Sequence, residues 1–239
     1  MILGNSGESG FTLTELLIGI VLSGIVIAGV YGFFVSQIKT YSLQEQLVEM
    51  QENARIALDT IVMGLQNAGY DPTSSDKFGI TTAAFSDSND PVLSLTTSTE
   101  LYFTVDESDA PRTATNGDGV IDNNPDERFG FRINSNTLEA QCFPDPNPCT
   151  DPWEAVADNI ESMSVTYTYE DPLQPGQWLS SQVVGLPSNS TSDRKFELIK
   201  AVTISLTAKT SQADPNYQVG DGHRRLTLSA EVAPRNLAY

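Results

Sequence analysis

Hydrophobic residues divide the chain into an apolar segment near the N-terminus, an amphipathic segment and a long mixed remainder. From Leu16 to Ile38 no residue is charged, over 23 positions rich in Leu, Ile, Val and Phe. A helix needs about 20 residues, at about 1.5 Å each, to cross the ~30 Å hydrocarbon core of a bilayer. The pattern therefore predicts one transmembrane helix.

After the apolar run, hydrophobic residues recur every three or four positions, which is the spacing of one helix face. They are Leu43, Leu47, Met50, Ala54, Leu58, Ile61, Leu65 and Ala68. No proline occurs before Asp71, and Gly69 followed by Pro72 is a helix stop signal. We therefore expect one long helix over residues 11–68, of which about 11–38 are transmembrane.

Beyond this helix, polar loops alternate with short segments whose alternating hydrophobicity is typical of strands. We expect strands at residues 100–105, 128–133, 138–142, 164–169, 198–209 and 225–232, a hairpin turn at 134–137 and a short helix at 153–160. The expected fold class is α+β, with the long N-terminal helix packed on an antiparallel β-sheet. Residues 69–239 would form its globular, β-rich head domain.

The N-terminus differs from a secretory signal, in which the cleavage site follows the apolar region. Here a polar leader, residues 1–10, comes first and ends at Gly10. Glu15 lies at the start of the apolar run, where an unpartnered carboxylate costs about 2.5–3.5 kcal/mol on membrane insertion scales. Cleavage after Gly10 would create an amine at Phe11 that can meet Glu15 of a neighbouring subunit. The alternative is a Glu15 that is hydrated at the headgroup boundary.

The string Gly-Phe-Thr-Leu-Thr-Glu-Leu-Leu-Ile at residues 10–18 resembles the type IV prepilin cleavage and methylation motif. The resemblance implies that a prepilin peptidase cuts between Gly10 and Phe11 and methylates the new Phe11 amine. It also implies that Glu15 guides docking of the subunit into a growing filament. The leader departs from the family pattern because it contains no Lys or Arg.

Residues 51–55, 68–70, 223–226 and 234–236 extend the resemblance to the PilW-like minor pilins. It implies a type IV pilin-like roll, held in the bacterial inner membrane by a single pass with a periplasmic head, then incorporated at or near the pilus tip to initiate assembly. The implied partners are other minor pilins, the major pilin, the prepilin peptidase, the inner-membrane assembly platform and inner membrane lipid. Two alternatives stay open, a J-type minor pseudopilin of type II secretion and a pilus-tip adhesin.

Charge and composition exclude several other classes of protein. The net charge of -18 repels phosphate backbones, so we expect no nucleic acid partner. The single histidine, His223, cannot form a histidine cluster for zinc, and we expect it to contact carboxylates beside Arg224 and Arg225. No constellation of residues supports catalysis, so we expect a protein that is not an enzyme.

Two cysteines enclose a short loop that contains three prolines. Because the prolines bend the chain, we expect a local disulfide between Cys142 and Cys149. Such a bond persists only in an oxidising compartment, which would place the second half of the chain outside the cytoplasm. The alternative is two free thiols in a reducing cell.

The segment around Gly117 resembles the core of a calcium loop, in which alternating oxygens flank a glycine turn. The candidate ligands are Asn116, Asp118, Asp122 and Asp126. The first and twelfth positions of the full loop hold Ala114 and Pro125, so the alternative is a polar surface turn. Calcium is thus a candidate ligand of a protein that we expect to require no cofactor.

Overall fold

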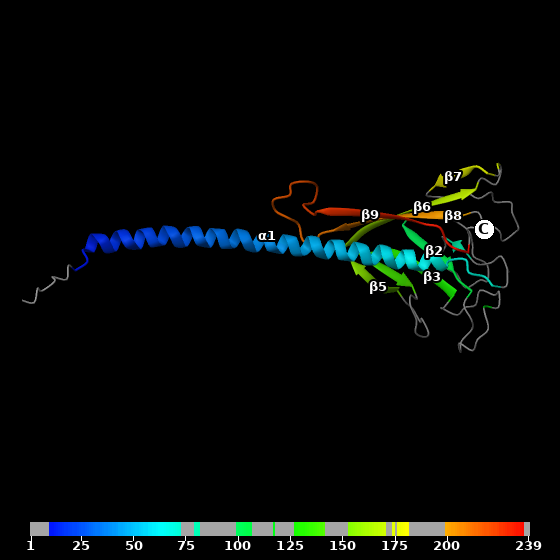
Figure 1. The fold of residues 1–239 in the computed structure, drawn as a ribbon, viewed down its shortest axis with the longest axis horizontal. Helices are drawn as coiled ribbons and strands as arrows, with labels where there is room; N and C mark the ends of the chain where they lie inside the picture. The colour runs from blue at the N-terminus through cyan, green and yellow to red at the C-terminus, as the bar shows by residue number, and fades with distance from the viewer. Residues whose placement is uncertain are drawn as a thin grey trace, which may run out of the picture. The chain divides into compact units, whose positions relative to one another are not determined.

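The computed structural model describes residues 10–72, 79–81, 99–106, 117, 127–141, 153–170, 174, 176–181 and 199–236 (Figure 1). The chain divides into two compact units, residues 1–46 and residues 47–239. The first unit holds the N-terminal part of helix α1, Leu13–Asn67. The second unit holds the remainder of α1 and the described strands β1 to β9.

Helix α1 begins two residues later than predicted and ends one residue earlier. It ends because Gly69 adopts a φ of 74°, a left-handed conformation that glycine accepts without steric penalty. The Gly69 amide then donates a hydrogen bond of 2.9 Å to the Thr104 carbonyl, which ties the end of the helix to a strand. The predicted stop signal therefore acts where the sequence places it.

The strands form two antiparallel sheets instead of the single sheet that we expected. The first has the order β1-β2-β3-β4-β5, comprising Ile80–Thr81, Glu100–Thr104, Arg128–Asn134, Thr137–Gln141 and Trp153–Asp158. The second has the order β7-β6-β8-β9, comprising Trp178–Ser181, Ile160–Glu170, Ile199–Lys209 and Arg225–Val232. Two short edge strands, β1 and β7, were not predicted.

The predicted hairpin turn between β3 and β4 is confirmed, with Asn134 paired to Thr137. Ser135 and Asn136 form the turn with φ values of 51° and 65°. Positive φ at both central residues matches the right-handed twist of the flanking strands. The turn therefore fixes the register of the hairpin.

The predicted helix at residues 153–160 is wrong, because these residues form β5 and the first residue of β6. Glu154, Ala155 and Ala157 favour a helix by intrinsic propensity, but β5 pairs with β4 along its length. Asn159 has a φ of 63°, which interrupts the extended conformation between the two strands. Pairing in the tertiary structure thus overrides local propensity.

The hydrophobic core of the second unit lies between α1 and the two sheets. Alternate residues of β6 and β8 are buried, which is the pattern of strands with one face toward a core. The helix approaches the first sheet closely at Gly64, where an added Cβ would lie 2.9 Å from the Phe103 ring. This close packing holds residues 47–67 of α1 firmly on the sheets.

Candidate functional site

The residues of the predicted cleavage site lie just before helix α1. Gly10, Phe11 and Thr12 are exposed and precede Leu13, the first helical residue. The Phe11 side chain is 87% exposed. Among the described residues, no atom lies within 4 Å of the position that a Cβ on Gly10 would occupy. Packing around the described residues therefore does not explain a glycine at this position.

Glu15 is held by two hydrogen bonds from Thr12. The Thr12 backbone amide donates to Glu15 Oε2 at 2.9 Å, and the Thr12 hydroxyl donates to the same oxygen at 2.8 Å. In return, the Glu15 amide lies 3.3 Å from Thr12 Oγ1. This reciprocal arrangement is a capping box, which satisfies amides that the first turn of a helix leaves without partners.

Thr12 is a functional candidate that the sequence analysis did not identify. The signal was present, because Thr-Leu-Thr-Glu at residues 12–15 fits the Ser/Thr-x-x-Glu pattern of a capping box. The box holds the carboxylate beside the helix N-terminus, where the helix dipole favours negative charge. Glu15 is thus oriented within its own chain.

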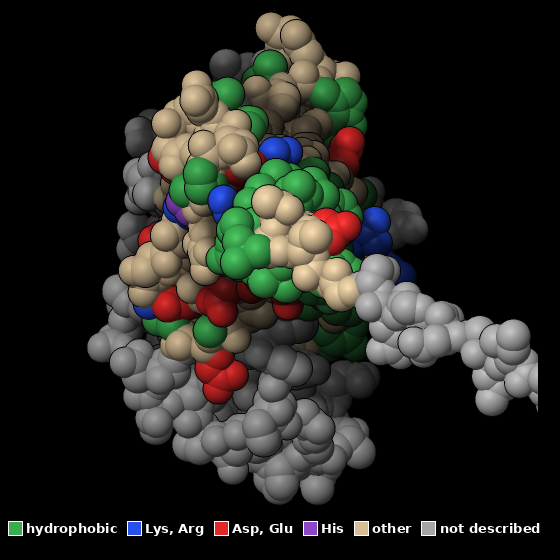
Figure 2. Space-filling model, turned by 90° about the vertical axis from the view of Figure 1, so that its left-hand side faces the viewer, with side chains coloured by type: hydrophobic (Ala, Val, Ile, Leu, Met, Phe, Trp, Pro, Cys, Tyr) green, Lys and Arg blue, Asp and Glu red, His purple; other side chains and the backbone are tan. Residues whose placement is uncertain are grey.

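The helix that follows is apolar on all sides. Leu16, Ile20 and Ile27 are 59%, 62% and 67% exposed. The apolar part of α1 is not buried within the chain, and α1 is long and apolar enough to cross a membrane. Figure 2, viewed from this end of the helix, shows the hydrophobic side chains gathered around it. Such a surface requires lipid or protein around it.

The loop between β8 and β9 carries the only histidine of the chain, His223, and Arg224, and Arg225 follows as the first residue of β9. Arg224 donates to the Asp214 carboxylate at 2.9 Å and lies 5.2 Å from the centre of the Tyr217 ring. The His223 ring lies 2.7 Å through Nδ1 from Thr210 O, and the His223 backbone amide donates to the Asp221 carboxylate at 3.2 Å. The predicted carboxylate contact is therefore made by the backbone of His223. The carboxylates in this loop bind the arginines, which offer more donors in a planar fork.

Arg225 joins this loop to the second sheet. Its guanidinium donates to both Glu161 oxygens, at 2.6 and 2.8 Å, and to both Asp221 oxygens, at 2.9 and 2.8 Å. Hydrogen bonds from Arg225 hold the pKa of each carboxyl below its ordinary value. Lys209 Nζ lies 3.8 Å from Glu161 Oε1, so two cations face two carboxylates in this cluster, and these contacts are structural.

The predicted calcium ligands, Asn116, Asp118, Asp122 and Asp126, lie outside the described residues. Gly117, inside the same motif, is described and buried, and an added Cβ there would overlap the Asp106 carboxylate. The side chains of Asp106 and Glu127 are also buried. Within the described part of the chain, no group of three or more His, Cys, Asp or Glu side chains could hold a metal ion. Calcium binding therefore stays a prediction.

The predicted disulfide also stays a prediction, because Cys142 and Cys149 lie outside the described residues. Strand β4 ends at Gln141 and strand β5 begins at Trp153. The two cysteines thus belong to the connection between neighbouring antiparallel strands.

Comparisons with known proteins bear on both units of the chain. A family model described as Prepilin peptidase-dependent protein B matches residues 43–231. A second model, the Prokaryotic N-terminal methylation motif, matches residues 5–31. Among solved structures, a type IV-like pilin from Thermus thermophilus is 16% identical with a TM-score of 0.41, over 79% of this chain and 98% of that chain. No curated protein matches the chain.

Proposed function

Since the chain belongs to the prepilin peptidase-dependent protein B family and carries a prepilin-type methylation motif, we propose that it is a PilW-like minor type IV pilin. The family matches make the chain a type IV pilin-like protein that depends on prepilin peptidase. In the proposed role, it enters the filament at or near the pilus tip and promotes pilus assembly. This role is structural and needs no catalytic group.

The capping box of Thr12 and Glu15 is the observation that carries this proposal. It holds the Glu15 carboxylate on Thr12, the residue that follows Phe11. Cleavage after Gly10 gives Phe11 a free amine, and methylation leaves an amine that still carries a positive charge, as in methylated lysine. Glu15 of one subunit then attracts the amine of the next subunit, in surroundings where an unpaired charge is expensive.

The proposed location follows from the same segment. The apolar part of α1 anchors the chain in the bacterial inner membrane, with residues 47–239 in the periplasm until assembly draws the subunit into a filament at the cell surface. Its proposed partners are other minor pilins, the major pilin, the prepilin peptidase and the assembly platform. A periplasmic location is also where a bond between Cys142 and Cys149 would persist.

Two alternative roles stay within the same family plan. A J-type minor pseudopilin would use the same processing but act in type II secretion. For a pilus-tip adhesin, the relevant observation is Trp178, which is 54% exposed on the edge strand β7. If the chain is an adhesin, loss of Trp178 reduces adhesion and leaves the number of pili unchanged. If it is an assembly subunit only, loss of Trp178 does not have this effect.

The test of the proposed function is the intact mass and N-terminal sequence of the chain, recovered from membranes and from sheared filaments. We expect a chain that begins at Phe11, carries one added methyl group and occurs in the sheared fraction. A membrane-bound chain that keeps residues 1–10 overturns the proposal. A processed chain that is absent from sheared filaments, with secretion lost in its deletion strain, supports the pseudopilin role instead.

The Glu15→Gln variant tests the role of the carboxylate. We expect normal cleavage and membrane insertion but several-fold less of the variant in sheared filaments, because the amide cannot pair with a charged amine. Glu45→Gln is the matched control, since Glu45 is an exposed acid on the same helix. Equal incorporation of both variants contradicts the assigned role of Glu15.

A further inference from the structure

The second sheet has an outer face that turns away from the core. Alternate residues of β6 and β8 are buried in the core, so the residues between them lie on the outer face. The register places side chains of β6, β8 and β9 in three rows across this face. Eight of the nine positions are Ser or Thr, and the rows are Ser162, Thr207 and Thr227, then Ser164, Ser205 and Ser229, then Thr166, Thr203 and Glu231. We call the eight Ser and Thr residues the hydroxyl face.

Hydrogen bonds between neighbouring strands hold side chains of the hydroxyl face in place. Ser205 Oγ lies 2.7 Å from Ser229 Oγ, and Thr207 Oγ1 lies 3.0 Å from Thr227 Oγ1. A hydroxyl can donate one hydrogen bond and accept two, so each pair keeps one hydrogen and several lone pairs that the pair itself does not use. Because these groups are already positioned, a ligand that bonds to them loses less entropy in ordering them.

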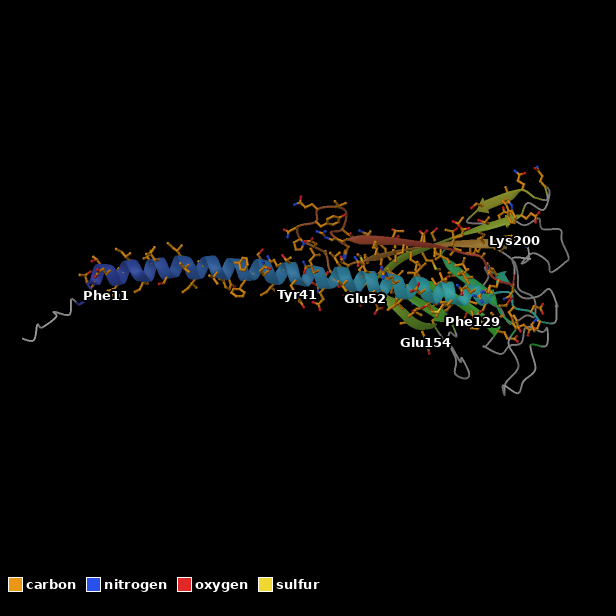
Figure 3. All side chains as sticks on the ribbon, in the orientation of Figure 1. Phe11, Tyr41, Glu52, Phe129, Glu154 and Lys200 are labelled. Carbon is orange, nitrogen blue, oxygen red and sulfur yellow. The ribbon has the colours of Figure 1, made fainter. Side chains whose placement is uncertain are left out.

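An exposed tryptophan lies on the same outer face beyond the three rows. Trp178 of β7 is paired with Glu170 of β6, which lies on the outer face because Tyr169 before it is buried in the core. The Trp178 side chain is 54% exposed. Lys200, labelled in Figure 3, marks this end of β8. From Ser162 to Glu170 the face extends about 27 Å along β6, at about 3.4 Å per residue.

Carboxylates border the hydroxyl face at both ends. At the end near the loop from β8 to β9, Arg225 donates to Glu161 and Asp221, so its charge is matched. Toward the other end, Glu231 completes the third row and Glu170 ends β6. In a chain with a net charge of -18, such a border repels anions. The face is therefore suited to an uncharged ligand that is rich in hydroxyl groups.

We infer that the hydroxyl face and Trp178 bind an uncharged polysaccharide with an extended, cellulose-like chain. Sugar hydroxyls donate and accept hydrogen bonds, as the Ser and Thr hydroxyls do, so the two surfaces are chemically matched. The Trp178 ring supplies apolar contact to the C–H groups on the face of a sugar ring. This inference goes beyond the proposed function, because pilus assembly requires no polysaccharide ligand.

The test is calorimetric titration of the full-length chain with cellohexaose and with mannohexaose, in a detergent that has no sugar headgroup. We expect binding of at least one of the two, and Trp178→Ala should weaken it about tenfold. The double variant Thr207→Val with Thr227→Val removes both hydroxyls of one pair but keeps the β-branched shape, and should weaken binding about threefold or more. Failure of the wild type to bind either sugar overturns the inference.

The matched controls lie outside the hydroxyl face. They are Tyr70→Ala, at another exposed aromatic residue, and Thr60→Val with Thr137→Val, and each should bind as the wild type does. Equal losses in the controls, or tighter binding of an anionic polygalacturonate fragment, overturn the inference. The thermal unfolding midpoint shows that each variant is folded. N-terminal processing and filament incorporation are scored separately, so failure here leaves the proposed function standing.

Discussion

At the scale of single residues, close approach explains one glycine that helix propensity alone disfavours. Gly64 lies inside α1, where glycine is less favourable than alanine by about 1 kcal/mol. Its missing side chain admits the Phe103 and Phe131 rings, which would lie 2.9 and 3.4 Å from a Cβ. The absence of a side chain on Gly64 therefore lets the helix pack closely against the first sheet.

We predict that Gly64→Leu destabilises the second unit by about 1–3 kcal/mol, because overpacking displaces rings or backbone. Gln51→Leu is the control, since Gln51 is exposed on the same helix and should change stability by less than about 0.5 kcal/mol. Thermal unfolding of the detergent-solubilised chain, followed by fluorescence of Trp153 and Trp178, measures both. Equal midpoints for the two variants would contradict the packing argument.

At the scale of elements, ion pairs hold the connection between β8 and β9 in place. Arg224 binds Asp214 within the loop, and Arg225 binds Asp221 in the loop and Glu161 on β6. Gly222, with a φ of 81°, permits the sharp bend before the two arginines. The loop is therefore fastened to the second sheet through β9.

Hydrogen bonds from Arg225 lower the pKa of Glu161 and Asp221 in the folded chain. The unfolded chain then binds more protons than the folded chain in acid, so this contribution to stability is full above ordinary carboxyl pKa values of about 4 and is lost as pH falls below them. The thermal unfolding midpoint of the wild type should therefore fall between about pH 5 and pH 2, and we predict that it falls less steeply with pH in the Arg225→Gln variant. Arg235→Gln, at another exposed arginine, should leave that slope unchanged.

At the scale of the whole molecule, the two units require different surroundings. The apolar side chains of the first unit are exposed, whereas the second unit buries a continuous core between α1 and two sheets. The first unit is therefore stable only in lipid or among other helices, while the second has the core of a domain that faces water.

The predicted calcium loop is tested on the full chain by adding and removing the metal. If residues 116–126 bind calcium, free Ca²⁺ at about 100 times the dissociation constant stabilises the chain by about 2.7 kcal/mol, and a chelator reverses the rise in unfolding midpoint. Mg²⁺ at equal concentration should have a smaller effect, because it demands a tighter octahedral site. The Asp118→Ala variant should show no calcium-dependent rise; a midpoint independent of calcium in the wild type refutes the site.

The sequence by itself determined the features that depend on local periodicity and short motifs. The long helix, its end near Gly69, most strands and the turn at Ser135 and Asn136 follow from hydrophobic spacing and from residues that accept positive φ. The processing motif is equally local, because Gly10, Phe11 and Glu15 lie within six positions. The capping box could also have been predicted from the sequence, because Thr12 and Glu15 have the spacing that it requires.

Only the tertiary structure decided the features that depend on which segments meet. β5 is a strand because β4 pairs with it, and the chain passes from the first sheet to the second at Asn159, between β5 and β6. Likewise, only burial separated the exposed residues Val48, Ile56 and Met63 of α1 from the core positions beside them. The physical reason is that strand pairing and burial are contacts between distant residues, which local hydrophobic patterns do not specify.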